Sequence, residues 1–249
     1  MMLEILKHPF QWLNYILCLW LLSAAATTMA QNTEPQPLEL PQTAQIWTSA
    51  SAKFNINDKM RFVLSTQLRA DNKPQYPLDR LFIEPSLRYN LPKGFEWRGG
   101  YRYGQRWGQK TQHRFWTSLS YKPDLGKHWD IKLNSILQAD LVAQNPINHD
   151  WRPQINIAYK TSKKAKIIPE IDAEFFYTFN YQYHTITRYR LSAACNYDLN
   201  KVHSFSIKYI YQRYINIGKP QADHILSIGY DVNIDLQPKK KGEKTPSGT

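Results

Sequence analysis

Cysteine is scarce in this sequence of 249 residues, which contains two. Cys18 lies in an apolar run near the amino terminus, and Cys195 stands alone in the rest of the chain. If the amino-terminal segment is removed, an intramolecular disulfide is excluded, and a single thiol does not make a metal site. Long apolar runs are also missing after residue 26, and the mean hydropathy of −0.57 is far too polar for a bundle of membrane helices.

The amino terminus has the features of a targeting segment. A weakly basic start is followed by an apolar run from Trp12 to Ala26 and by small residues before Gln31. The run is short for a spanning helix, which needs about 20 residues, although an uncleaved anchor is the alternative interpretation. We therefore expect an exported protein whose signal peptide, residues 1–30, is cleaved near Ala30.

Basic residues outnumber acidic ones, with 32 Lys and Arg against 20 Asp and Glu and a formal net charge of +12. A basic chain often binds nucleic acid, but an exported protein without a nucleic-acid motif does not fit that class. Internal carboxylates, lipopolysaccharide phosphates and small anionic solutes are better partners for the arginines.

Apolar and polar residues alternate from Leu81 to Tyr121, which indicates strands with two different faces. The apolar face is rich in aromatic rings, and the other face is charged over much of its length. A soluble sandwich tends to carry small polar residues on its outer face. The pattern therefore favours strands with lipid on one side and a wet, charged lumen on the other.

The same alternation predicts about eleven strands of roughly 10–13 residues, close to the tilted span of a bilayer. The connections between them read as alternately short and long, as in outer-membrane barrels with short periplasmic turns and longer outer loops. Single-chain bacterial barrels have even strand numbers. We therefore expect an all-β, antiparallel transmembrane up-and-down β-barrel of about 12 strands, with ten as the fallback and a hidden strand before Gln45.

Around this barrel, at residues 45–236, we expect two further segments. A Pro-rich segment occupies residues 31–44, and a basic tail rich in Lys and Gly occupies residues 237–249. Terminal segments of this composition are commonly disordered.

Several strands carry distinctive motifs. These are Leu87-Arg88-Tyr89, Gly100-Tyr101-Arg102-Tyr103, His113-Arg114-Phe115-Trp116, Glu174-Phe175-Phe176 with Asn180, and Arg188-Tyr189-Arg190. The motifs resemble those of one known family, the outer-membrane proteins catalogued as domain of unknown function 2490. The resemblance extends over most of the chain after the leader, although Gln112 stands where an acid is expected. The resemblance implies an outer-membrane β-barrel of Bacteroidetes type, and it implies no activity.

The charged faces of the strands would meet inside such a barrel. The acidic row Glu170, Asp172 and Glu174 could be a catalytic or Ca²⁺ site, because hard cations take oxygen ligands. Confined carboxylates are normally paired, however, so we favour a salt-bridge network in the lumen and expect no metal or cofactor. Its expected members are Glu84, Arg88, Glu96, Arg98, Arg102, Arg114, Glu170, Asp172, Glu174, Arg188 and Arg190.

The aromatic residues suit the boundary between lipid and water, where amphipathic rings anchor a membrane protein. The expected interface set is Trp97, Tyr101, Tyr103, Trp129, Trp151, Tyr209 and Tyr211. We place Trp47 and Trp107 in the same girdle, whereas the alternation puts Trp116 on the lumen side.

Three functions follow from these observations. The first, which we favour, is an outer-membrane barrel without enzymatic activity, either a small passive channel or a structural barrel. The second is an outer-membrane lipid-modifying hydrolase, but the histidines are scattered and no Gly-x-Ser-x-Gly elbow is present. The third is a soluble periplasmic ligand-binding barrel with its apolar face inside. The sequence does not indicate a ligand or an oligomeric state.

Overall fold

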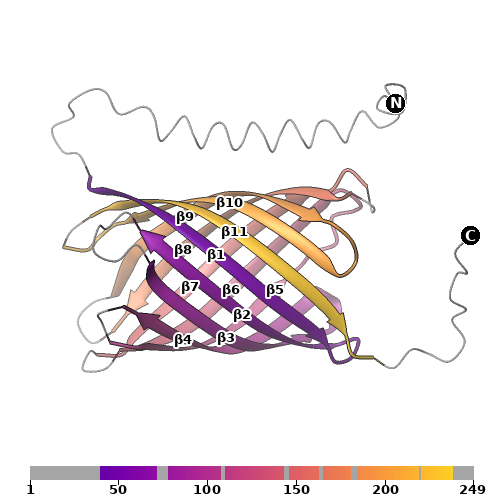
Figure 1. Cartoon of the computed structure of the whole chain (residues 1–249), viewed down its shortest axis with the longest axis horizontal. Helices are drawn as coiled ribbons and strands as arrows, with labels where there is room; N and C mark the ends of the chain where they lie inside the picture. Colours follow the sequence, from indigo (N-terminus) through magenta and orange to yellow (C-terminus); the bar gives the residue numbers. More distant parts are fainter. Residues whose placement is uncertain are drawn as a thin grey trace, which may run out of the picture.

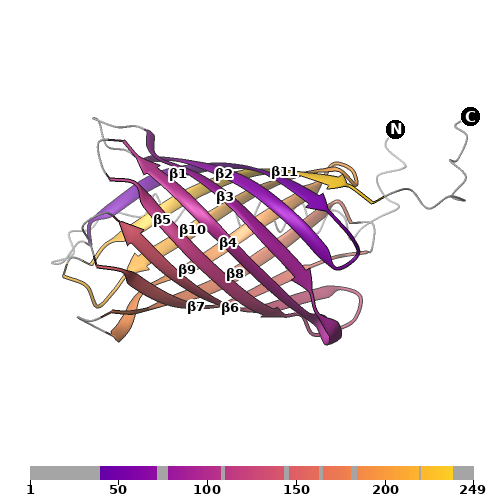
Figure 2. The same ribbon diagram turned by 90° about the horizontal axis from the view of Figure 1, so that it is seen from below.

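The computed structural model describes residues 40–71, 78–107, 110–142, 146–162, 165–180, 184–218 and 220–237. These residues form one closed barrel of eleven strands (Figures 1 and 2), which confirms the expected all-β barrel. The strands are β1 Gln42–Asn55, β2 Met60–Asp71, β3 Leu78–Asn90, β4 Phe95–Arg106, β5 Gln112–Tyr121, β6 Trp129–Val142, β7 Asn148–Tyr159, β8 Ile167–Phe179, β9 His184–Asp198, β10 His203–Tyr214 and β11 Ala222–Asp235.

Two smaller features complete the description. A single 3₁₀ turn, Pro92–Gly94, joins β3 to β4. Among the residues with a described structure, no helix is long and apolar enough to span a membrane. The expected signal peptide and residues 238–249 of the expected tail lie outside the described residues.

The barrel closes through a parallel pair. β1 pairs with β11 in parallel from Gln42 opposite Ala222 to Asn55 opposite Asp235, whereas consecutive strands pair antiparallel. Figure 1 shows the two strands side by side and pointing the same way. The count of eleven strands is close to the expected twelve. A barrel needs an even number of strands only if its first and last strands pair antiparallel, and here they pair in parallel. Residues 31–39, where we expected part of a further strand, lie outside the described residues.

The two ends of the barrel are named here after the direction of the parallel strands β1 and β11. The end at which β1 begins, at Gln42, is called the entry end, and the end at which β11 finishes, at Asp235, is called the exit end. The expected alternation of short turns and long loops is wrong, because connections of four to seven residues occur at both ends. The reason is that strands extend into the expected loops: β3 already begins at Leu78, and β7 at Asn148.

The two faces of the sheet differ sharply in chemistry. Large apolar side chains on alternate positions point outward and are exposed, for example Leu133 at 45% and Phe115 at 55%. The intervening positions point into the lumen, where Glu174 at 4% and Gln138 at 4% are buried. By this alternation, Arg213 near the entry end of β10 is the one basic side chain at the outward positions of the described strands. Asp79 of β3 is the one acidic side chain with outward parity, but it lies beside a register shift and pairs with Arg106. The barrel is therefore apolar outside and polar inside.

Candidate functional site in the barrel lumen

The lumen contains two hollows that share no lining residue. The larger one, of about 1170 Å³, lies toward the exit end between residues such as Lys53, Glu96 and Asp231, and is called here the exit chamber. The smaller one, of about 430 Å³, lies toward the entry end between residues such as Arg69 and Arg190, and is called the entry chamber. Charged side chains line both.

Glu96 is the centre of the charge network in the exit chamber. Its carboxylate is buried and accepts hydrogen bonds from Arg98 Nε at 2.6 Å and Lys132 Nζ at 2.9 Å, and it also pairs with Arg88. Arg88 on β3 and Arg98 on β4 lie directly opposite each other in the ladder, so their like charges need the shared acid. Lys132 reaches the carboxylate from β6.

The acidic row on β8 is divided between different cations. Glu174 Oε1 accepts bonds from Arg152 Nε at 2.9 Å and Nη2 at 2.5 Å, and its Oε2 lies 3.3 Å from Arg190 Nη1. Lys208 Nζ on β10 lies 2.9 Å from Asp172 and 3.6 Å from Glu170. The row is thus neutralised by basic side chains. In the part of the chain that the structure describes, no three His, Cys, Asp or Glu residues are grouped so as to hold a metal ion.

The remaining expected arginines pair with acids outside the β8 row. Arg102 bonds to Glu84 on the adjacent strand. Arg114 makes a two-point contact with Asp140, at 2.5 Å and 2.8 Å, and Arg188 lies 3.5 Å from Asp150. Asp140, Asp150, Arg152 and Lys208 were missing from the expected network. Each has the parity of a lumen position on its strand, and this signal could have found them.

Four rings at lumen positions, Trp47, Phe82, Trp116 and Phe176, are called here the inner aromatic layer; Trp47 and Phe82 line the entry chamber, and none of the four lines the exit chamber. Trp47, Phe82 and Phe176 are almost fully buried, so placing Trp47 in the outer girdle was wrong. Its neighbours at the same parity, Gln45 and Ser49, are lumen residues, and its indole Nε1 donates to Gln45 Oε1 at 2.9 Å. Only Trp116 had been assigned to the lumen from the alternation.

Guanidinium groups stack on the rings of this layer. The Arg69 guanidinium carbon lies 3.7 Å from the centre of the Trp47 ring, and that of Arg188 lies 3.9 Å from the Phe176 ring. Such contacts are favourable electrostatically, more so where water is excluded. Buried rings and guanidinium groups on adjacent strands are therefore in contact at these lumen positions.

Glycines on β4 make room for two of the rings. A Cβ atom added to Gly100 would lie 2.7 Å from Trp116 ring atoms, and one added to Gly104 would lie 2.8 Å from Phe82. A strand glycine often marks such a close approach.

We expect Gly100→Ala to lower the free energy of unfolding by about 1–3 kcal/mol, because an overpacked interior must displace the ring or the backbone. Urea unfolding of the refolded protein measures this. Gly218→Ala is the control, since an added Cβ there meets no atom within 4 Å. Equal stability of the two variants would contradict the packing argument.

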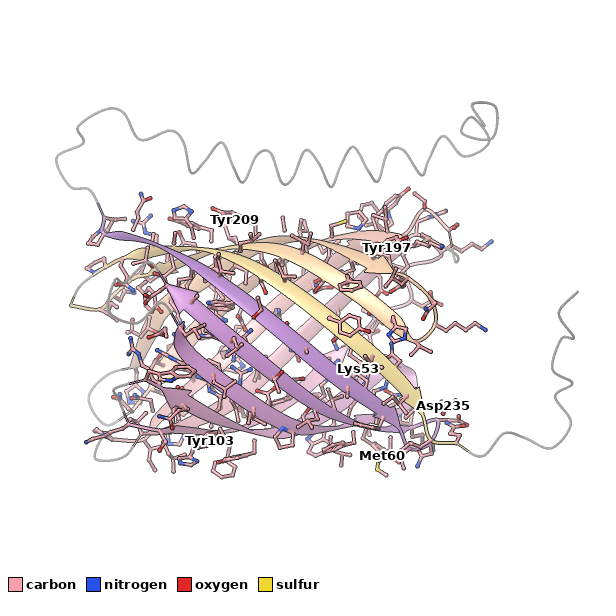
Figure 3. The ribbon with its side chains drawn as sticks, in the orientation of Figure 1. Lys53, Met60, Tyr103, Tyr197, Tyr209 and Asp235 are labelled. Carbon is pink, nitrogen blue, oxygen red and sulfur yellow. The ribbon has the colours of Figure 1, made fainter. Side chains whose placement is uncertain are left out.

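The expected interface aromatics all lie on outward positions. Trp97 and Trp129 lie toward the exit end, and Tyr101, Tyr103, Trp151, Tyr209 and Tyr211 lie toward the entry end. Figure 3 shows Tyr103 and Tyr209 on the outer surface near the entry end and Tyr197 near the exit end. Rings thus gather toward both ends of the apolar surface. Trp107, just after β4, is exposed.

Three histidines belong to this outer surface and contact tyrosine hydroxyls. Nδ1 of His113 lies 2.6 Å from the Tyr101 oxygen, that of His224 lies 2.7 Å from Tyr209, and that of His203 lies 2.7 Å from Tyr230. These imidazoles are separated by the barrel wall from the carboxylates of the lumen.

Comparison with known protein families gives a match over most of the chain. A family model described as "Protein of unknown function (DUF2490)" matches residues 44–222, which reach from β1 to the first residue of β11. A search of curated proteins finds no match.

Proposed function

We propose, from the premise that the chain belongs to the family described as protein of unknown function DUF2490, that it is a bacterial outer-membrane β-barrel without enzymatic activity. It is exported with cleavage of a leader near Ala30, its partners are outer-membrane lipid and lipopolysaccharide, and its charged lumen is closed rather than an open pore.

The observation that carries this proposal is the apolar outer surface. Exposed large apolar residues occur on every strand of the barrel. Soluble monomers rarely expose apolar patches larger than a few hundred Å². A lipocalin-like barrel that binds a ligand in water holds its apolar residues inside. A barrel with lipid outside and a polar interior alternates as this one does, so the membrane location is favoured over the soluble alternative.

Rings and histidines near both ends support the same location. Outer-membrane barrels carry an apolar band of about 25 Å with aromatic girdles at both interfaces. Tyr211 and His224 lie opposite each other near the entry end, and Tyr230 contacts His203 near the exit end. Hydroxyl and imidazole groups at these levels reach water while their rings remain in lipid.

The location is tested by fractionation and by migration in a denaturing gel. The folded protein should accompany the outer membrane, and an unboiled sample should migrate differently from a boiled one. Recovery in the soluble periplasmic fraction, without a change in migration on boiling, would reject the proposal.

The separate chambers favour a structural barrel over a passive channel. We expect no steady conductance from the unaltered protein in a planar bilayer, because the two chambers share no lining residue and the rings Trp47, Phe82 and Phe176 are buried at lumen positions. Replacing Trp47 and Phe176 together by alanine should create conductance steps.

The matched control for that measurement replaces the outward rings Trp151 and Phe175, which should leave the bilayer silent. Steady conductance of the unaltered protein would instead identify a passive channel.

A further inference from the structure

Arg69 is a half-buried cation for which no carboxylate partner is found among the described residues. Its Nε donates to Gln67 Oε1 at 2.8 Å, and its guanidinium group stacks on Trp47 at 3.7 Å and on Phe82 at 4.6 Å. A charge removed from water is normally paired. Arg69 therefore has contacts that fix its position but none that neutralises its charge.

The surroundings of Arg69 add further positive charge. Arg80, Arg102, Arg114 and Arg190 lie close enough to act on its charge, and like Arg69 they line the entry chamber. Their acids are largely engaged elsewhere. Glu174 is shared between Arg190 and Arg152, and Asp79 lies 2.7 Å from Arg106 but 3.4 Å from Arg80.

Hydrogen-bond donors are also in excess here. The buried Nε atoms of Arg80 and Arg188 have no hydrogen-bond partner. Among the carboxylates that line the chamber, Asp223 is held by the neutral groups of Thr43, at 2.6 Å, and Gln212, at 2.8 Å. Eight arginines and four aspartates, Asp71 among them, line the chamber. Three further carboxylates, Glu84, Asp150 and Glu174, pair with arginines of the lining. The cations thus exceed the acids by one, and the unbonded Nε atoms provide further donors.

We propose that the entry chamber binds one phosphoryl-bearing anion, held by Arg69, Arg80 and Arg190. The planar fork of a guanidinium group matches phosphate oxygens, which accept two parallel N–H bonds. A phosphoryl group carries up to two negative charges near neutral pH. Arg69 offers it a cation with no carboxylate partner among the described residues, and Arg80 and Arg190 offer cations that share their acids with other arginines. The volume of about 430 Å³ fits a pyrophosphate or a small organic phosphate but no polymer.

The phosphoryl group has two possible sources, a dissolved phosphate compound or the phosphate of a lipopolysaccharide sugar. Stacking on Trp47 and Phe82 holds the Arg69 guanidinium in place before the anion arrives, so little side-chain freedom is lost on binding. The free protein is less stable as a result, because it keeps a cation that no carboxylate neutralises. Sites that bind ligands commonly lower stability in this way.

The proposal is tested by titration calorimetry of the refolded full chain in lipid-free detergent, with pyrophosphate as the probe. A salt concentration of about 0.15 M screens weak binding to the protein surface. We expect one saturable site. Arg69→Gln should weaken binding at least about tenfold, in line with the loss of a charge-assisted contact.

Arg61→Gln is the matched control. Arg61 lies on the same strand and face, and its Nε also bonds to an amide, Asn55 Oδ1 at 2.6 Å, but it lies near the exit end. Pyrophosphate affinity should be unchanged in this variant. Thermal unfolding without pyrophosphate should not be lowered in the Arg69 variant, whereas a purely structural arginine would destabilise the barrel when removed.

The possible results divide clearly. No binding by the unaltered protein, equal binding by the Arg69 variant, or equal loss in both variants would overturn the proposal. Tight binding of lipopolysaccharide but weak binding of pyrophosphate would assign the phosphoryl group to the lipid, and the reverse would assign it to a dissolved compound. Because binding is measured in detergent, these results are independent of membrane location and conductance.

Discussion

Replacing Glu174 by alanine lowers the free energy of unfolding by about 3–5 kcal/mol, the cost of removing one partner from a buried ion pair. Glu174 is 4% exposed and is the shared acceptor for Arg152 and Arg190. Without it, two guanidinium groups from β7 and β9 face each other across β8 in a confined space. Urea unfolding of the refolded variant gives the size of the loss.

Glu170→Gln provides the comparison on the same strand and face. Glu170 lines the wide exit chamber, and Lys208 lies 3.6 Å from it, beyond hydrogen-bonding distance. We expect a loss of at most about 1 kcal/mol there, as for a hydrated pair. If both variants unfold at the same urea concentration as the unaltered protein, the network contributes nothing to stability and its charges must be explained by binding alone.

Much of the fold follows from the parity of the residues, because a strand fixes the side of each side chain before its partners are known. Parity accordingly puts the expected charged residues on the lumen face and the seven expected interface rings on the outer face, whereas Trp47 was assigned against its parity. Closure could not be predicted in the same way. The parallel pairing of β1 with β11 depends on the hydrogen-bonding edges of two strands far apart in the chain, and neither strand carries a local signal for the direction of its partner.

The inner aromatic layer shows a second limit of sequence reasoning. Aromatic residues were assigned to the lipid boundary by their chemistry, although Trp47 has lumen parity. Phe176 lies between two outward aromatic neighbours, Phe175 and Tyr177, so its run appears uniformly apolar. Each ring stacks on the arginine directly opposite it on the adjacent strand, Trp47 on Arg69 and Phe176 on Arg188, and these contacts explain why the rings are stable in the lumen. The contacts depend on the register between two strands, which the pattern of a single strand does not reveal.

Ion pairing shows the same limit. The acidic row of β8 was expected to share one network with the arginines of the following strand and of the early strands. Glu174 does meet Arg190, but Arg102 and Arg114 pair with acids on adjacent strands. In a barrel, opposite residues of adjacent strands are much closer than residues across the lumen. Charged side chains are therefore neutralised first by partners on adjacent strands. Contacts between strands that are not adjacent, such as that of Lys208 on β10 with Asp172 on β8, need a long side chain.

Leu133→Arg should reduce the stability of the barrel in phospholipid vesicles by about 2–4 kcal/mol, the cost of an arginine on the lipid face near the bilayer midplane. Leu133 lies in β6, points outward and is 45% exposed. Its neighbours across the ladder, Tyr121 and Ile155, are outward residues too. The measurement is reversible unfolding, or the folded yield, in vesicles of fixed composition.

Leu125→Arg separates this effect from a general effect of added charge. Leu125 is similarly exposed, at 49%, but it lies in the connection between β5 and β6 outside the apolar surface. It should change stability by less than about 0.5 kcal/mol, as surface substitutions usually do. If water rather than hydrocarbon surrounds the barrel, the two variants will be equally stable, because a hydrated arginine at an exposed position has little effect on stability. A lower stability of the Leu133 variant than of the Leu125 variant in vesicles therefore indicates that β6 contacts hydrocarbon.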